Sequence, residues 1–215
     1  MKQLLKKEFS LAVHPTSWLF LGLSAMVLIP NYPYYVIFFY TGLGVFFTCL
    51  NGRENQDVLF SLLLPVSRKQ VVGARITTVV LLELLQLLLT ALFSLLRRAL
   101  PLGENAAGME ANLALLGLGL VVMTLGHGAF FRVYYKNVQK VGVAFLWCSA
   151  VEFVCIGILE VMAHTVPLFR DYLDTPDPAF LTKKLLVLAL GAAVYGLLTF
   201  LTYRRAVRDF EAQNL

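Results

Sequence analysis

The chain has 215 residues, of which 59% are hydrophobic and only 14% are charged. Soluble domains contain roughly 45–50% apolar and about 25% charged residues, so this composition excludes an ordinary soluble domain and favours an integral membrane protein. The net charge of +5 comes from 18 Lys and Arg, which lie in short clusters between apolar runs. That arrangement is typical of loops between membrane spans and not of a nucleic-acid-binding groove.

Residues 1–14 are predicted to form an amphipathic helix that lies in the membrane interface. Lys2, Lys6 and Lys7 share one arc of a helical wheel, and most of the apolar residues lie on the opposite arc. Glu8 falls among the apolar residues and does not fit this pattern. Pro15 favours a break before the first span, so we expect the lysines to face anionic lipid headgroups. The alternative is a plain extension of the first span into the cytoplasm.

The apolar runs predict an all-α integral membrane fold with six transmembrane helices in a single domain, residues 1–215. Residues 9–52 contain no Asp, Glu, Lys or Arg, and the Pro30–Pro33 turn divides them into two spans. The predicted spans are Ser17–Ile29, Tyr34–Leu50, Ile76–Leu96, Ala111–Phe131, Val141–Met162 and Leu185–Tyr203.

The basic residues predict the orientation of the chain. With the amino terminus inside, 13 of the 18 Lys and Arg lie on the cytoplasmic side and the remainder lie outside. Cytoplasmic loops carry the excess of basic residues, so both termini are predicted to be cytoplasmic. Arg97 and Arg98 are the exception, and we expect both side chains to snorkel from the outer end of span three toward headgroups.

The cytoplasmic loop at residues 51–75 is the most informative segment. Glu54 and Asp57 precede a short apolar run, which predicts a helix with an acidic start that ends at Pro65. The S-x-x-Q sequence beginning at Ser67 is a capping box, which starts the helix leading into span three. A short apolar helix at the membrane surface cannot bury itself alone, which indicates a protein partner. The alternative is a helix that lies on the bilayer.

Residues 54–75 resemble the corresponding loop of small ABC type-2 permeases, which include the permease subunits of the phenol-soluble-modulin exporters of Gram-positive bacteria. In that family this loop is the coupling helix, which docks in a groove on the ATPase subunit. The architecture resembles that family too, including an extracellular loop with short helices, here residues 163–184. The resemblance implies that a set of residues couples the chain to the ATPase: Glu54, Asp57, Phe60, Leu63, Pro65, Ser67 and Arg68.

A permease of this kind implies a separate ATPase subunit, because the sequence contains neither a GxxxxGK[ST] motif nor any Gly-Lys dipeptide. ATP and Mg²⁺ are therefore expected on the partner, and this chain is expected to hold no cofactor, no metal and no catalytic residue. The resemblance also implies a second copy of the chain, or a homologous permease, in a bacterial cytoplasmic membrane. The cargo that it implies is an amphipathic peptide or another lipophilic toxic compound that is moved outward.

Glu83, Gln86 and Glu152 are the candidates for the translocation pathway. A carboxylate in the hydrocarbon region is costly, so each polar side chain should face protein or water. Glu83 and Gln86 lie three residues apart and share one face of a helix. The alternative is a protonated or paired packing residue. His127 lies between two glycines, which favours close helix packing with one satisfied hydrogen bond.

Two other classes of function explain fewer of these features. An intramembrane metalloprotease would need H-E-x-x-H or a comparable cluster, but the three histidines lie in separate segments and none precedes a glutamate. The substrate-binding membrane component of an importer would not explain the capped loop after span two. The three cysteines lie in apolar runs without the spacing of a metal site or of a disulfide framework.

Overall fold

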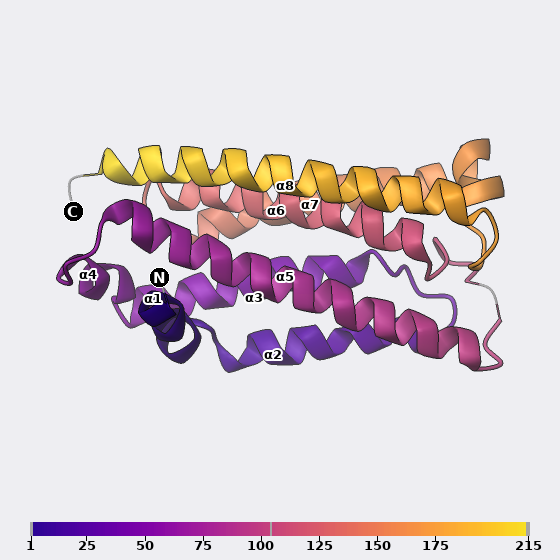
Figure 1. Cartoon of the computed structure of the whole chain (residues 1–215), viewed down its shortest axis with the longest axis horizontal. Coiled ribbons are helices and arrows are strands. Elements are labelled where there is room, and N and C mark those ends of the chain that lie inside the picture. The colour runs from indigo at the N-terminus through magenta and orange to yellow at the C-terminus, as the bar shows by residue number, and fades with distance from the viewer. Residues whose placement is uncertain (1, 104, 214–215) are drawn as a thin grey trace.

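The computed structural model describes residues 2–103 and 105–213, and these residues form helices and loops without a β-strand. The predicted all-α architecture is confirmed. The first residue of the predicted interfacial helix and the last two residues of the predicted domain lie outside the described residues. The helices form an elongated bundle with both ends of the chain at one end of it (Figure 1), which we call the proximal end. The opposite end is the distal end.

The long helices account for most of the predicted spans. Within the described residues, five helices are long and apolar enough to cross a membrane, and the number rises to six if the two arms of the bent amino-terminal segment count as one span. In chain order the elements are α1 (Lys2–Lys7), the π-helical turn η1 (Glu8–Ala12), α2 (Pro15–Gly22), the 3₁₀ helix η2 (Leu23–Leu28), α3 (Val36–Glu54), α4 (Asp57–Leu62), α5 (Arg68–Ala99), α6 (Leu113–Tyr134), α7 (Val141–Thr165), the π-helical turn η3 (Phe169–Leu173) and α8 (Leu181–Glu211).

The amino-terminal segment bends sharply at the predicted position. The axes of Lys2–Ala12 and Pro15–Leu28 differ by 87°. His14 caps the second arm, because its Nδ1 accepts a hydrogen bond of 3.2 Å from the amide of Thr16, and Pro15 occupies the first helical position. The second arm lies where the first of the six spans is predicted, but it is long enough to be a possible span only together with Lys2–Ala12.

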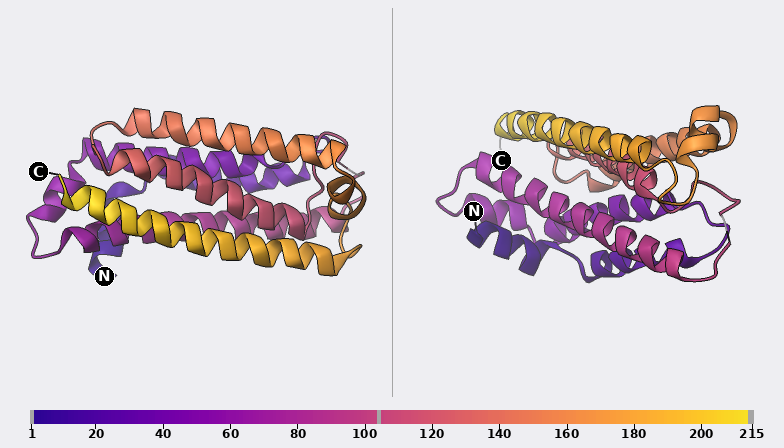
Figure 2. Two further views of the ribbon diagram at one scale, coloured as in Figure 1. Left: turned by 90° about the horizontal axis from the view of Figure 1, so that it is seen from above. Right: turned by 45° about the vertical axis from the view of Figure 1, so that its right-hand side comes forward.

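α6 lies at the centre of the bundle and packs against α3, α5, α7 and α8. In the left view of Figure 2 it runs between α7 and α8. Its crossing with α8 depends on two glycines. A Cβ on Gly191 would lie 2.1 Å from the carbonyl oxygen of Gly117, and a Cβ on Gly117 would lie 2.6 Å from Cα of Leu188. Small residues allow this close approach of two backbones.

Several helices extend beyond the predicted spans at the proximal end. α3 continues through Asn51 to Glu54, and α8 continues to Glu211. α5 is one uninterrupted helix from Arg68 to Ala99. Hydropathy marks only the part of a helix that lies in hydrocarbon, whereas capping groups and turns decide where the helix ends.

The prediction that Arg97 snorkels toward headgroups is wrong. The Arg97 side chain is buried, and it donates hydrogen bonds to the carbonyl oxygens of Val27 at 3.2 Å and Gly103 at 2.6 Å. Its guanidinium also lies 5.4 Å from the centre of the Tyr34 ring. One carbonyl of η2 and one of the distal loop thus satisfy Arg97 inside the protein, while Arg98 is exposed as expected.

The predicted distal loop at residues 163–184 is shorter than expected, because α7 continues to Thr165 and α8 already begins at Leu181. The connection contains one π-helical turn, η3. Buried Lys184 fixes its end by donating hydrogen bonds to the carbonyl oxygen of Thr175 at 2.5 Å and to Asp177 at 3.2 Å.

Candidate functional site

α4 lies at the proximal end and follows a sharp reversal of the chain. α3 ends at Glu54, Gln56 adopts the left-handed backbone conformation (φ 50°, ψ 34°), and α4 begins at Asp57. Non-glycine residues rarely adopt that conformation, and here it lets α4 pack against α3 and α5. α4 ends at Leu62, shortly before Pro65, which cannot continue a helix.

The outward side of α4 and of the turn that follows it is apolar and exposed. Leu63 is 85% exposed, Phe60 is 50% exposed, and Leu59 and Leu64 are exposed as well. We call these four residues the α4 patch. A contiguous group of exposed apolar side chains at the end of a helical bundle is typical of a contact surface.

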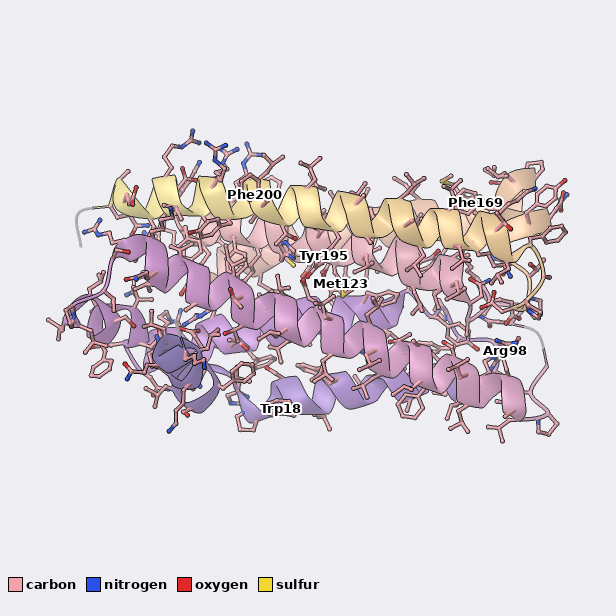
Figure 3. All side chains as sticks on the ribbon, in the orientation of Figure 1. Trp18, Arg98, Met123, Phe169, Tyr195 and Phe200 are labelled. Carbon is pink, nitrogen blue, oxygen red and sulfur yellow. The ribbon has the colours of Figure 1, made fainter. Side chains whose placement is uncertain are left out.

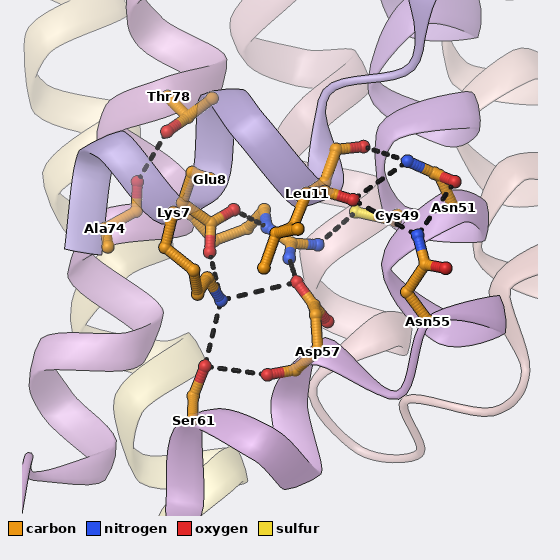
Figure 4. A network of polar contacts seen from close by, with 12 residues as sticks. Lys7, Glu8, Leu11, Cys49, Asn51, Asn55, Asp57, Ser61, Ala74 and Thr78 are labelled. Atoms are coloured by element: carbon orange, nitrogen blue, oxygen red, sulfur yellow. Dashed lines mark hydrogen bonds and ion pairs between the residues drawn. The ribbon is translucent and has the colours of Figure 1, made fainter. Parts of the chain in front are cut away.

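The inward side of α4 faces a group of buried charges, shown in Figure 4. We call Lys7, Glu8, Asp57 and Arg75 the charge cluster. Arg75 donates a hydrogen bond from Nε to Glu8 and another from Nη2 to Asp57. Lys7 Nζ lies 2.9 Å from a Glu8 oxygen and 3.4 Å from an Asp57 oxygen. Two basic and two acidic groups therefore neutralise one another between the amino-terminal segment, α4 and α5.

Three members of the charge cluster are buried from solvent, Lys7 is half-buried, and the Asp57 Oδ1 atom has no hydrogen-bond partner among the described residues. Glu8 and Asp57 are each 1% exposed and Arg75 is 3% exposed. Ser61 of α4 accepts a 2.9 Å hydrogen bond from Lys7 and donates one of 2.7 Å to the Asp57 carbonyl oxygen. Removing one partner from such a buried group costs roughly 3–5 kcal/mol, because it leaves an uncompensated charge. The cluster thus fixes three separate segments relative to one another.

Two asparagines at the end of α3 hold the amino-terminal segment in a second place. The Asn51 side-chain amide donates to the carbonyl oxygens of Leu11 at 3.0 Å and Ala12 at 3.1 Å, and Asn55 donates to Leu11 at 3.2 Å. These carbonyls belong to the last turn of η1 and lack partners within that helix. The amino-terminal segment is therefore attached to the α3–α4 corner, with Lys2 and Lys6 exposed on its other side.

The start of α5 is fixed by the predicted capping box and by a contact with α8. The Ser67 hydroxyl accepts a hydrogen bond from the Gln70 amide at 3.3 Å, and the Gln70 side chain accepts one from the Ser67 amide at 2.9 Å. Arg68 donates from Nη1 to the carbonyl oxygens of Phe210, Glu211 and Gln213 at 3.2, 3.1 and 2.6 Å. Because these carbonyls lie at the end of α8, the Arg68 side chain caps the carboxy-terminal end of α8, while Arg68 itself is the first residue of α5.

The predicted coupling residues thus divide into two groups. Phe60 and Leu63 are exposed in the α4 patch, and Glu54 is exposed at the end of α3, where it pairs with Arg53. Asp57 is buried, so in this conformation its side chain is not exposed to a partner protein, although the resemblance implied that it takes part in coupling to the ATPase. Its side chain is an internal anchor. The remaining predicted residues lie in the turn and at the start of α5: Pro65, Ser67 and Arg68.

The intramembrane polar residues are buried inside the bundle of one chain. Glu83 of α5 accepts a hydrogen bond of 2.5 Å from the Tyr195 hydroxyl of α8 and lies 2.9 Å from His127 Nδ1 of α6. Gln86 donates a 2.7 Å hydrogen bond to Ser24 of η2. Neither side chain lines an open surface, so a role in a translocation pathway would require these helices to move apart.

Glu152 of α7 is also buried, at 1% exposed. Its carboxylate lies against two glycines, so that a Cβ on Gly42 of α3 would come within 2.5 Å of it and a Cβ on Gly126 of α6 within 2.2 Å. Its Oε2 atom has no hydrogen-bond partner among the described residues. The glycines therefore create the space that this side chain occupies between three helices.

Sequence reasoning missed Arg75, Glu8 and the inward direction of Lys7. One indication was present, because Glu8 lies on the apolar arc of the amino-terminal helix, and a charged side chain on a buried face requires a partner. Arg75 resembled the other basic residues of the loop, and its partners are 18 and 67 residues away in the chain.

A comparison with known protein families identifies the chain's relatives. The family model described as "ABC-2 family transporter protein" matches residues 3–204, which include the amino-terminal segment, α4 and every long helix up to the last part of α8. No curated protein and no solved structure matches the chain.

Proposed function

Because the chain belongs to the ABC-2 transporter family and is a transmembrane permease component of an ABC transporter, we propose that it is the permease subunit of an ATP-driven exporter. The observation that carries the proposal is the α4 patch. This patch is an apolar surface, and the charge cluster holds the inward side of the short helix α4 against the rest of the protein. A separate ATPase subunit, which binds ATP and Mg²⁺, is the partner that fits this surface.

Movement of α4 would reach α5 by two routes. One is the chain itself, through Pro65 and the capped turn at Ser67. The other is the hydrogen bond from Arg75 to Asp57, which connects the two helices directly. α5 then contacts α6 and α8 through Glu83, His127 and Tyr195, so displacement of α5 would be transmitted to the helices behind it.

The proposed transporter contains two permeases, either two copies of this chain or this chain and a homologue. Each chain has a large exposed apolar surface, because most of the apolar side chains of α7 and α8 are not buried within the bundle. Those faces are open to lipid or to a second permease. Opening of the buried polar layer around Glu83, Gln86 and Glu152 would provide a polar route for cargo, which is the pathway role proposed for these residues.

The proposed cargo is an amphipathic peptide or another lipophilic toxic compound, and this part of the proposal is supported by the resemblance to permeases that export peptide toxins. The proposed location is the bacterial cytoplasmic membrane, with both termini and α4 in the cytoplasm. The excess of basic residues at the proximal end supports that orientation.

The test introduces charge into the α4 patch. Phe60→Asp and Leu63→Asp alter exposed side chains, so the permease should fold and reach the membrane in normal amounts. Copurification of a coexpressed ABC-type ATPase should be lost, or its ATP turnover should no longer respond to cargo. Leu100→Asp is the control, because Leu100 is 41% exposed at the distal end. Normal ATPase association and normal stimulated turnover in both α4 variants would exclude the coupling role.

A further inference from the structure

A groove opens between α6, α7 and α8 in the proximal half of the bundle, away from the charge cluster and the α4 patch. Its volume is about 330 Å³. α6 contributes the floor with the small residues Gly128 and Ala129, Val151 of α7 lines one side, and Leu201 and Thr202 of α8 line the other. A Cβ on Gly128 would already lie 3.3 Å from the Thr202 hydroxyl oxygen, so the small residues of α6 create this space.

The lining changes character along the groove. Thr124 and Leu125 line its inner part, toward the centre of the bundle, whereas Arg132 and Arg205 lie at its proximal end. From Thr124 to Arg132 the α6 backbone advances about 12 Å at 1.5 Å per residue. A molecule in the groove would therefore meet apolar walls at hydrocarbon depth and two guanidinium groups near the membrane surface.

The arginines at the proximal end have capacity for an anion. Arg132 is exposed, and the Arg205 Nε atom is buried without a hydrogen-bond partner among the described residues. The Arg205 Nε atom forms an ion pair with Asp209 at 3.6 Å, and the Arg208 Nε atom lies 3.8 Å from the same carboxylate, so one acidic group serves two arginines. In Figure 3, nitrogen atoms gather along the carboxy-terminal part of α8, beyond the labelled Phe200. The local charge remains positive.

From these features we propose that the groove binds one anionic phospholipid of the leaflet at the proximal end, with its phosphate on Arg132 and Arg205 and an acyl chain along Val151 and Leu201. Arginine binds phosphate oxygens in a bidentate manner. Basic pockets between transmembrane helices at the membrane surface select anionic headgroups. Neither the export function nor the orientation of the chain enters this assignment, which requires only that the chain lies in a bilayer.

The groove predicts a specific lipid and not merely an attraction between a basic surface and an acidic membrane. The full-length permease would be purified, stripped of lipid and titrated with phosphatidylglycerol, phosphatidylcholine or inorganic phosphate, and bound species would be counted by native mass spectrometry. Wild-type protein should retain one phosphatidylglycerol per chain at least tenfold more tightly than phosphatidylcholine. Inorganic phosphate alone should bind weakly, because it lacks the acyl chain.

Matched variants separate the groove from general electrostatics. Arg132→Gln with Arg205→Gln should reduce phosphatidylglycerol retention about tenfold. Arg204→Gln with Arg208→Gln removes the same charge from the same end of the bundle but leaves the groove lining intact, and should change retention less than twofold. Ala129→Leu fills the apolar part without a change of charge and should also weaken retention. Thermal unfolding of each variant verifies that it is folded.

Three results would overturn the assignment. The first is equal loss of retention in the two double-arginine variants, which would indicate general surface attraction. The second is equal retention of phosphatidylglycerol and phosphatidylcholine by the wild-type protein. The third is lipid that is bound to the monomer and expelled from the dimer, which would show that a second permease covers the groove.

Discussion

Arg75 donates a hydrogen bond to Asp57 across the turn between α5 and α4, although the two residues are 18 positions apart in the chain. The same guanidinium binds Glu8 of the amino-terminal segment. One side chain therefore connects three segments: the amino-terminal segment, α4 and the start of α5. This arrangement makes the amino-terminal segment part of the surface that presents α4, and not only a membrane anchor.

Arg75→Met should destabilise the proximal end of the protein. The substitution leaves Glu8 and Asp57 buried with only Lys7 to compensate them, and the expected loss is roughly 3–5 kcal/mol in the free energy of unfolding. Hydrogen exchange of residues 57–62 should become faster, while exchange in the distal half of α5 should not change. Arg208→Met removes an arginine whose side chain is 74% exposed and is the control. Unchanged exchange in α4 would show that the cluster does not hold it.

The lysines of the amino-terminal segment should have different roles, although the sequence places them on one arc. Lys7 is turned toward Glu8 and Asp57, whereas Lys6 is exposed. Lys7→Gln should therefore accelerate hydrogen exchange in residues 57–62. Lys6→Gln should leave it unchanged and should only weaken attraction to anionic vesicles, by on the order of 1 kcal/mol. Identical behaviour of the two variants would contradict the inward position of Lys7.

The sequence predicted features that depend on neighbouring residues better than features that depend on the packing of distant segments. The Ser67 capping box is correct because all of its atoms lie within four residues, and the bend at Pro15 is correct because proline acts locally. Arg97 was assigned to headgroups because nothing in its own segment indicates Val27 or Gly103 as acceptors.

The candidate site shows the same division. The exposed positions of Phe60 and Leu63 follow from a short apolar helix that has no room to be buried. The burial of Asp57 does not follow from its position at the start of that helix, where a carboxylate equally suits the helix dipole. It depends on Arg75 and Lys7, which the fold brings to the same place. A charged residue on an apolar arc, such as Glu8, is the one local pattern that indicates such a contact.

Gly191→Ala should weaken the contact between α6 and α8. The added Cβ would lie 2.1 Å from the carbonyl oxygen of Gly117, so the two backbones must separate, at an expected cost of about 1–3 kcal/mol. Gly196→Ala is the matched control on the same helix, because no atom lies within 4 Å of its added Cβ. That variant should be as stable as the wild-type protein or slightly more stable, since alanine favours a helix. Thermal unfolding in one detergent compares them, and equal midpoints would contradict the close crossing.

Cysteine labelling should place the proximal end in the cytoplasm. Cys49 and Cys148 are buried, so replacing Cys155 with alanine gives a background with little reactivity toward a membrane-impermeant maleimide. Single cysteines at Ala106 and Thr182, both exposed at the distal end, should react in intact cells. Cysteines at Lys69 and Gln139, both exposed at the proximal end, should react only after the cells are opened. The expectation rests on the excess of basic residues at the proximal end. External labelling at Lys69 would put α4 outside the cell, where no ATPase could reach it, and the coupling role of the α4 patch would then be excluded.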